Sequence, residues 1–166
     1  MLKIKLLNES IASKEQIISP AYHGGKWPGP PARINITGRG SLGAGAYFTQ
    51  IKERAEYYAE ETNGIVTQCS LRLKNPIILR SKKNEFKYTA PDGNQNVDPC
   101  CALLIFLGLK KEKAESVVER AYDQFGYVGK QISTLAQKLG YDGIILYDND
   151  LISEIVIWNN DAIINS

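Results

Sequence analysis

Apolar and polar residues follow two different periods along the chain, and the change of period outlines the fold. Residues 65–73 alternate between apolar and polar, which predicts a strand with one buried face. Residues 77–79 follow as a second strand after the break at Asn75-Pro76. Shorter extended pieces are expected at residues 17–22, 33–36, 46–49, 143–147 and 154–158.

Helical spacing prevails between these strands. Residues 51–62 repeat apolar and aromatic positions every three or four residues, with Thr49 as the expected cap. Three further helices are expected, one beginning at Asp98-Pro99 and two at residues 110–125 and 131–139. The pattern predicts a single α+β domain over residues 1–166, largely antiparallel, with an added helical segment at about 97–139.

The composition is that of a folded globular protein, because 43% of the residues are hydrophobic and 23% are charged. The formal net charge of +2 is too small to predict nucleic-acid binding by itself. Cys69 and the neighbours Cys100 and Cys101 make an odd count, which argues against a disulfide framework. His23 is the only histidine and no Cys-x-x-Cys spacing occurs, so no metal site is expected.

The sequence predicts neither a secretory signal nor a membrane helix. Residues 1–7 lack a long apolar run, and the longest apolar stretch, near residues 100–107, is far too short to span a bilayer. We therefore expect a soluble protein that does not contact a membrane and acts in the cytoplasm, either of the cell that produces it or of a target cell.

Four short motifs follow one another along the chain. They are Tyr22-His23-Gly24-Gly25, a stretch from Gly43 to Thr49 that contains Tyr47-Phe48, Tyr58 eleven residues after Tyr47, and residues 151–158 around Glu154. In this order they resemble the His–Tyr–Glu branch of the ADP-ribosyltransferases, which includes diphtheria toxin and the poly(ADP-ribose) polymerases. The resemblance runs from about residue 23 to residue 163, and residues 81–131 match no motif of that family.

The resemblance implies an ADP-ribosyltransferase-like fold, with two small antiparallel sheets around a cleft for NAD+, the substrate. His23, Tyr47 and Glu154 would be the catalytic residues. Tyr47 and Tyr58 would enclose the cationic nicotinamide, and Gly24 would let its backbone approach the carboxamide. His23 would donate a hydrogen bond to a ribose hydroxyl. Glu154 would stabilise the ribosyl cation that develops as the glycosidic bond breaks.

Residues 38–43 match Gly-x-Gly-x-x-Gly, the fingerprint of a dinucleotide-binding βαβ unit. The chain continues from there as an extended stretch instead of a helix, so a Rossmann fold is not predicted. Arg39 in this loop is still a candidate partner for the pyrophosphate of NAD+, by its charge and its bidentate geometry. A solvent-exposed arginine without a ligand is the simple alternative.

Three positions depart from the family pattern. Gly25 replaces the Ser or Thr that often follows His-Gly, and Ala55 replaces the polymerase serine that binds the carboxamide. Ile152 stands where the arginine-modifying branch has Glu or Gln, which disfavours an arginine acceptor because an aliphatic side chain cannot accept hydrogen bonds. Helix geometry places Tyr58 on the face of Ala55, toward the nicotinamide, and turns Tyr57 to another surface.

The expected function is mono-ADP-ribosylation of a macromolecular acceptor, with a protein favoured over a nucleic acid. By analogy alone, a small enzyme of this type suits a toxin or effector, a factor in phage–host conflict or an anti-defence protein. Two alternatives stay open. One is an NAD+ glycohydrolase, in which water is the acceptor, and the other is a non-catalytic module that binds a nucleotide or a partner on the same fold.

Overall fold

The structure is a computed structural model that describes residues 15–82 and 84–164. Its strands are β1 (Gln16–Gly25), β2 (Ala46–Phe48), β3 (Ile65–Leu73), β4 (Pro76–Lys82), β5 (Lys87–Thr89), β6 (Gln95–Asn96), β7 (Gly143–Asp148), β8 (Leu151–Ile157) and β9 (Ile163–Ile164). Its helices are α2 (Lys52–Glu61), α3 (Pro99–Phe106), α4 (Lys111–Phe125), α5 (Gln131–Lys138) and the short 3-10 helix η1 (Asn160–Ala162). The N-terminal stretch in which no secretory signal is expected lies outside the described residues.

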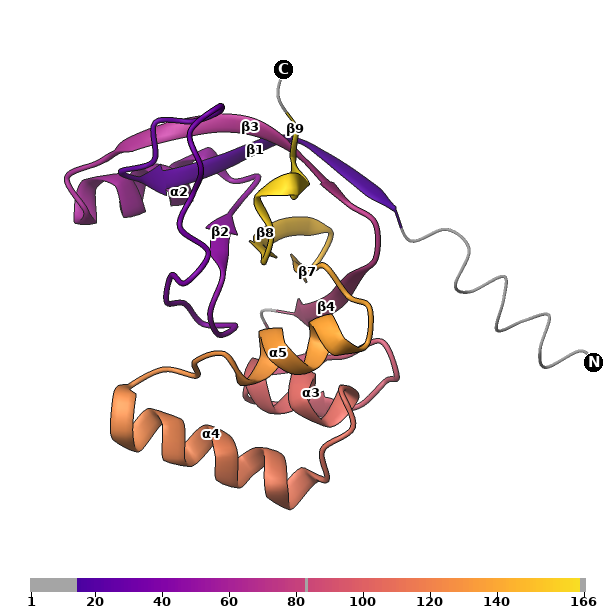
Figure 1. Ribbon diagram of the computed structural model, residues 1–166. Helices are drawn as coiled ribbons and strands as arrows, with labels where there is room; N and C mark the ends of the chain where they lie inside the picture. Colours follow the sequence, from indigo (N-terminus) through magenta and orange to yellow (C-terminus); the bar gives the residue numbers. More distant parts are fainter. Residues whose placement is uncertain (1–14, 83, 165–166) are drawn as a thin grey trace, which may run out of the picture.

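Two sheets, the helix α2 and a helical segment make up most of the described part of the chain (Figure 1). One sheet has the strand order β1-β3-β9, and the other has the order β2-β8-β7-β4-β5-β6. Neighbouring strands run antiparallel except for β4 and β7, which are parallel. A parallel pair needs a long crossover, and the chain from β5 through α5 supplies it. The predicted α+β class is confirmed.

The helical segment consists of α3, α4 and α5 and lies at the lower end of the molecule in Figure 1. Asp98 caps α3, because its Oδ1 accepts hydrogen bonds from the backbone N–H groups of Cys100 at 2.8 Å and Cys101 at 3.1 Å. Gly126, with φ of 77°, ends α4 in the left-handed conformation. The three helices expected in this segment are present where the sequence predicts them. No helix among the described residues is long and apolar enough to cross a membrane.

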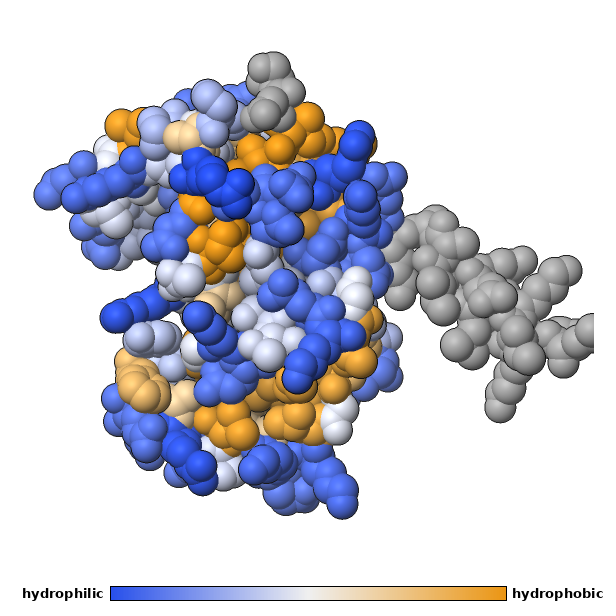
Figure 2. Space-filling view, viewed as in Figure 1, coloured by the Kyte–Doolittle hydropathy of each residue, from blue (hydrophilic) through white to orange (hydrophobic). Residues whose placement is uncertain are grey.

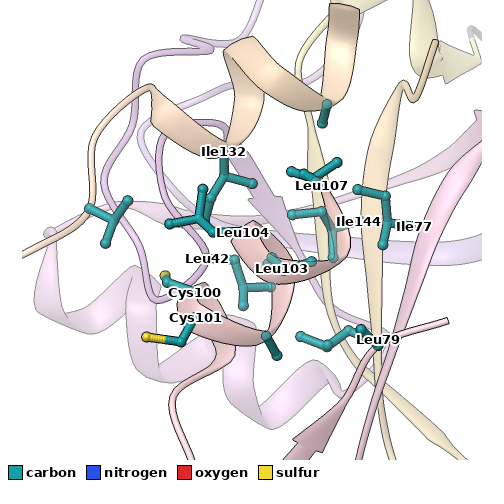
Figure 3. Close-up of a cluster of buried hydrophobic side chains, with 14 of the residues drawn as sticks. Leu42, Ile77, Leu79, Cys100, Cys101, Leu103, Leu104, Leu107, Ile132 and Ile144 are labelled. Atoms are coloured by element: carbon teal, nitrogen blue, oxygen red, sulfur yellow. The ribbon is translucent and has the colours of Figure 1, made fainter. Parts of the chain in front are cut away.

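Two clusters of buried apolar side chains occupy opposite faces of the six-stranded sheet. Successive residues of a strand point to opposite faces, so Ile144 packs in the first cluster and Ile145 in the second. The first cluster joins the sheet to the helical segment through Leu103 and Ile132 (Figure 3). The second cluster joins the sheet to β1 and β3. Apolar side chains also reach the surface over the lower part of the molecule (Figure 2).

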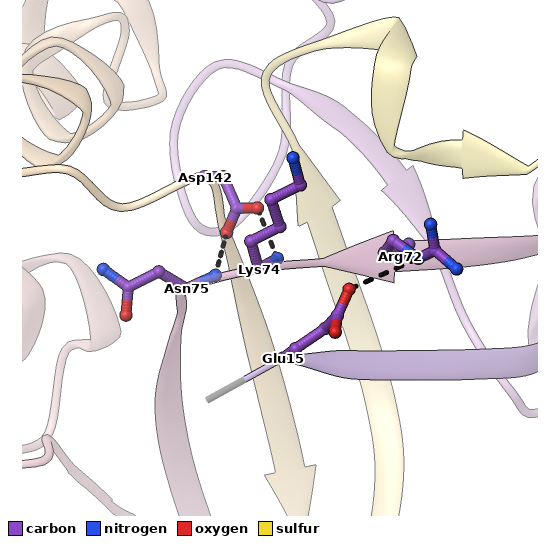
Figure 4. Close-up of polar contacts among 5 residues, drawn as sticks. All are labelled: Glu15, Arg72, Lys74, Asn75 and Asp142. Carbon is purple, nitrogen blue, oxygen red and sulfur yellow. Dashed lines mark hydrogen bonds and ion pairs between the residues drawn. The ribbon is translucent and has the colours of Figure 1, made fainter. Parts of the chain in front are cut away.

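The bend between β3 and β4 is held by one carboxylate. The backbone N–H of Lys74 donates to Oδ2 of Asp142 at 2.6 Å, and that of Asn75 donates to Oδ1 at 3.0 Å (Figure 4). Asp142 comes directly before β7, so these bonds fix the point where the chain passes from one sheet to the other. The ion pair between Glu15 and Arg72, at 3.4 Å, joins two exposed side chains and contributes little to stability.

Two local predictions are wrong. Residues 33–36 form no strand, because the side chain of Asn160 takes both backbone groups of Ile34, accepting from its N–H at 2.8 Å and donating to its carbonyl at 3.1 Å. Thr49 does not cap α2, whose N-cap is Ile51, without a side-chain hydrogen bond. The Thr49 hydroxyl accepts instead from the backbone N–H of Ile51 at 3.0 Å. Ile51 is the N-cap residue itself, whereas a capping side chain accepts from the N–H groups of the first helical turn.

Candidate functional site

A cavity of about 620 Å³ opens among β1, β2, α2, β8 and the connection between β1 and β2, residues 26–45. Its wall contains every residue that the sequence proposes for the site: His23, Gly24, Arg39, Tyr47, Tyr58 and Glu154. These residues come from five separate parts of the chain, and only the folded arrangement of both sheets brings them together.

His23 is fixed by its neighbours in one tautomer. A carbonyl can only accept, so ring Nδ1 carries the proton and donates to the carbonyl of Tyr47 at 2.8 Å. Trp27 and Phe48 pack against the ring with centroid distances of 5.9 Å and 5.5 Å. Burial lowers the pKa of His23, and the hydrogen bond to Tyr47 opposes this only in part. The expectation that His23 donates to a ligand is therefore corrected, since the Nε2 of a neutral ring accepts.

The ring and the hydroxyl of Tyr47 both contact the connection between β1 and β2. The hydroxyl donates to the carbonyl of Gly43 at 2.5 Å and accepts from the backbone N–H of Leu42 at 3.0 Å. A side-chain carbon on Gly40 would come within 2.2 Å of the Tyr47 ring, so the backbone at Gly40 lies directly on that ring. Burial raises the pKa of Tyr47, and the negative charge of Glu154 raises it further.

Glu154 lies inside β8, although the sequence places it at the start of a strand. It pairs with Leu146 in β7, and the next pair, Ile152 with Tyr147, leaves Ser153 as the extra residue of a β-bulge. The buried Ser153 hydroxyl donates to the carbonyl of Leu146 at 3.3 Å. Because the bulge interrupts the alternation of the strand, Glu154 lines the cavity while Ile152 packs against the second apolar cluster.

The carboxylate of Glu154 is half-buried, and two polar neighbours stabilise its charge. Burial raises the pKa of Glu154, whereas a hydrogen bond from Ser41 and the positive charge of Arg54 lower it. The Ser41 hydroxyl lies 3.1 Å from each of the two carboxylate oxygens. Arg54 is held nearby, because its Nη1 donates to the carbonyl of Ser153 at 3.2 Å.

Tyr57 and Tyr58 take different positions on α2. Tyr58 lines the cavity together with Ala55, on the helix face that the sequence indicates, and the wall of the cavity does not include Tyr57. The two rings meet edge to face with their centroids 5.6 Å apart. Both side chains are exposed, so Tyr58 presents its ring at the mouth of the cavity and not in the core.

Gly24 lines the cavity, but helix packing explains its missing side chain. A side-chain carbon on Gly24 would come within 1.9 Å of the carbonyl oxygen of Ala55 and 2.9 Å of the backbone nitrogen of Ala59. Glycine at this position therefore lets α2 approach β1, a role different from the approach to a carboxamide expected from the sequence. A side chain on Gly25 would press on Nε2 of His23, at 2.8 Å, which accounts for the departure from Ser or Thr there.

Arg39 packs against the helical segment. Its guanidinium lies 4.6 Å from the ring centroid of Tyr127, in the connection between α4 and α5, within the range of a cation–π contact. The glycine-rich residues 38–43 are followed by β2 and not by a helix, in agreement with the sequence-based rejection of a Rossmann unit. Arg39 is therefore placed where it reaches both the cavity and the helical segment.

Sequence reasoning missed two residues of the site. Arg54 lies four residues before Tyr58, so helical spacing places both on one face, and this signal could have found it. Ser41 gave no such signal, because its contact with Glu154 joins residues far apart in the sequence.

Four basic side chains line the cavity against the single acid Glu154: Lys26, Arg33, Arg39 and Arg54. This balance favours an anionic ligand.

The cysteines are not placed as nucleophiles. All three are free and buried. Burial raises the pKa of Cys100 to about 12, so its thiol is protonated at neutral pH. Residues 15–82 and 84–164 contain no group of three or more His, Cys, Asp or Glu side chains that could hold a metal ion.

The cavity thus combines one carboxylate, three tyrosine side chains, a neutral imidazole and an excess of positive charge. These groups can hold a flat cation between aromatic faces, hold an anionic group at the basic wall and stabilise positive charge that develops beside Glu154. In the comparisons with known proteins, no family model, no curated protein and no solved structure matches this chain.

Proposed function

We propose that this protein is an ADP-ribosyltransferase that cleaves NAD+ and transfers ADP-ribose to a macromolecule, and that its two sheets form an ADP-ribosyltransferase-like fold. One observation carries the proposal. His23, Tyr47, Tyr58 and Glu154, which the sequence resemblance selects from four distant motifs, all line the same cavity. A resemblance by chance would give no reason for these four side chains to meet.

The charges of NAD+ match the lining of the cavity. The cationic nicotinamide would lie against the tyrosine rings of Tyr47 and Tyr58, which offer dispersion and cation–π attraction. The diphosphate would lie at the basic wall, where Arg39 offers paired donors. A ribose hydroxyl would donate to Nε2 of His23, which is free of the proton that Nδ1 carries.

Glu154 would act on the bond that breaks. When the bond between C1′ of the ribose and the nicotinamide nitrogen breaks, its electron pair leaves with neutral nicotinamide and positive charge develops at C1′. A carboxylate that accepts a hydrogen bond from the ribose and lies near this charge lowers the barrier. The acceptor nucleophile then forms a new bond to C1′ and releases its proton to solvent.

The acceptor is proposed to be a protein side chain other than arginine. The position two residues before the carboxylate would have to accept hydrogen bonds from a guanidinium, which offers donors only. Here that position is Ile152, which is aliphatic and packs against the second apolar cluster. A toxin, effector or anti-defence role would suit an enzyme of this kind, and we propose it by analogy alone.

The direct test is incubation of the purified chain with labelled NAD+ and a host lysate, with Glu154→Gln as the matched control. Nicotinamide release and macromolecular label are measured together, followed by digestion with protease or nuclease. Label that protease removes, and that the control fails to incorporate, is the expected result.

The other outcomes separate the alternatives. Nicotinamide release without labelled macromolecules would make the chain an NAD+ glycohydrolase, and label removed by nuclease would make the acceptor a nucleic acid. An unchanged amount of NAD+ in every reaction would leave a binding module and would overturn the proposed enzyme activity.

A further inference from the structure

Residues 38–45, here called the site loop, lie over the groups that NAD+ would use. The Ser41 hydroxyl is shared between both oxygens of Glu154, at 3.1 Å from each. Gly40 covers the ring of Tyr47, and the Tyr47 hydroxyl is bonded on both sides to the site loop, through Leu42 and Gly43. The edge of the carboxylate between its two oxygens and one face of the Tyr47 ring are therefore already occupied.

A bound dinucleotide needs these same positions. A ribose hydroxyl must donate to Glu154, and nicotinamide must lie on an open aromatic face. Ser41 offers Glu154 the same chemistry as a ribose hydroxyl, a single O–H donor on a small carbon group. Ser41 and a ribose hydroxyl cannot both occupy the edge of the carboxylate between its two oxygens at the same time.

We propose that the site loop is a built-in occupant of the NAD+ site, with Ser41 standing in for a ribose hydroxyl, and that it must withdraw before NAD+ binds. This proposal rests on the function proposed above. The proposal also predicts an effect of Ser41 on NAD+ affinity. If only molecules with an open site loop bind NAD+, the apparent affinity is reduced in proportion to the fraction of molecules that are open.

The helical segment holds the site loop in this position. The backbone N–H of Ala44 donates to the carbonyl of Gly129 at 2.9 Å, and the Cys100 thiol donates to the carbonyl of Ser41 at 3.2 Å. Arg39 packs on the ring of Tyr127. These contacts assign a role to the part of the chain that matches no motif of the family: it supports the closed position of the site loop.

The site loop has few bonds of its own. Its internal backbone hydrogen bonds are Gly43 N–H to Gly40 carbonyl at 3.2 Å and Gly45 N–H to Gly38 carbonyl at 3.1 Å. Ser41 and Arg39 are exposed at the surface. Leu42 is buried in the first apolar cluster and anchors that end of the site loop. Residues 38–41 bury little apolar surface by comparison, and such segments open at low free energy, so withdrawal of these residues does not require unfolding of the domain.

The first test compares Ser41→Ala with Thr37→Ala. Ser41→Ala removes the competing hydroxyl, so the KM for NAD+ should fall by about three- to tenfold while kcat changes less than about twofold, as expected for the loss of one exposed hydrogen bond of ordinary strength. Thr37 is an exposed hydroxyl in the same connection that bonds only within it, to Asn35, and its variant should match the parent. A fall in kcat without a fall in KM would mean that Ser41 positions Glu154 for catalysis, which overturns the proposal.

A second measurement needs no activity. The carboxyl carbon of Glu154 is followed by carbon-13 NMR as the pH is changed. The charged and titratable groups that act on Glu154 or are influenced by it are Arg54, Tyr47, Tyr88 and Cys100, from α2, β2, β5 and α3. All four are present in both chains, so loss of the Ser41 hydrogen bond alone should move the Glu154 titration to higher pH in Ser41→Ala. An unchanged titration would mean that Ser41 does not hold the Glu154 carboxylate, and it would overturn the proposal.

Tyr127→Leu tests the support by the helical segment, because it removes the ring beneath Arg39 and keeps an apolar side chain. The KM for NAD+ should fall in the same direction as in Ser41→Ala, and an unchanged KM would remove the helical segment from the proposal. If no chain consumes NAD+, the proposed function fails. The Glu154 titration then still decides whether Ser41 holds the carboxylate.

Discussion

The helical segment and the cavity differ in the kind of side chain that they bury. In the helical segment, Leu103 and Ile132 are completely buried among apolar neighbours, and Asp98 satisfies the first backbone donors of α3. In the cavity, Glu154 is a carboxylate held where burial opposes its charge. The difference shows that the candidate site holds a charged group at some cost in stability, which apolar packing elsewhere in the molecule offsets.

The largest expected effect comes from Glu154→Gln, which keeps the shape of the side chain and removes its charge. NAD+ consumption should fall by about 100- to 1,000-fold, equivalent to roughly 3–4 kcal/mol of transition-state stabilisation. NAD+ binding, measured by calorimetry, should change far less than turnover. Equal turnover by the variant and the parent would exclude Glu154 from the mechanism.

The same variant should be more stable than the parent at neutral pH. The pKa of Glu154 is raised above its ordinary value of 4.5, so the folded state holds this proton more tightly than the unfolded state. The cost of ionising the carboxylate is therefore absent at low pH and appears as the pH rises through the raised pKa. The gain in melting temperature for Glu154→Gln should be present at pH 7 and shrink toward pH 4.

Leu103→Ala makes the opposite change in the helical segment. It leaves a cavity beneath α3 in the first apolar cluster and should lower the free energy of unfolding by about 3 kcal/mol. The kcat of the molecules that remain folded should stay close to that of the parent. The control is Leu139→Ala at an exposed leucine just after α5, which should change stability by less than about 0.5 kcal/mol in urea unfolding.

A smaller effect distinguishes two neighbouring residues in α2. Tyr58→Ala should weaken NAD+ binding by about 1–3 kcal/mol, because a ring that faces the cavity is lost. Tyr57→Ala should change the affinity by less than about 0.5 kcal/mol, since this ring lies outside the wall of the cavity. Fluorescence titration of both variants measures the difference, and a larger loss at Tyr57 would place the ligand on the wrong face of the helix.

The smallest effect is expected at the cap of α3. Asp98→Ala removes the hydrogen bonds to the backbone of Cys100 and Cys101 and should cost about 1 kcal/mol of stability. Asp98→Asn keeps an oxygen that can accept from the same donors and should recover most of the loss. Thermal unfolding of the two variants compares them, and equal losses would mean that the charge of Asp98 matters more than its capping bonds.

The two regions also differ in how much of them the sequence predicts. Local signals determine the helical segment, because Asp98-Pro99 marks a helix start and the apolar spacing of residues 110–125 and 131–139 marks two helices. In the connection from residue 26 to 45, the residues that reach the site or replace the expected strand are placed by distant partners. Ile34 is held by Asn160, and Ser41 is held by Glu154. The apolar–polar alternation of residues 33–36 therefore produced no strand, because the backbone of Ile34 bonds to a side chain and not to a neighbouring strand.

The candidate site was predictable as a set of residues but not as an arrangement. The motifs around His23, Tyr47 and Glu154 selected side chains that meet at the cavity. The tautomer of His23 depends on the carbonyl of Tyr47, and the direction of Glu154 depends on a β-bulge at Ser153. Both follow from pairing between strands, which a linear pattern does not contain.

The order of strands in the larger sheet has a consequence for the timing of synthesis. Among the strands that the structure describes, β2 pairs along its length with β8 alone, and the ribosome makes β8 more than a hundred residues later. The helical segment, by contrast, is built from contacts within one stretch of chain and can form early. Tyr47 therefore cannot meet Glu154 on a nascent chain until β8 has left the ribosome. The protein is made with the groups of its candidate site apart, and the same late step that completes the sheet completes that site.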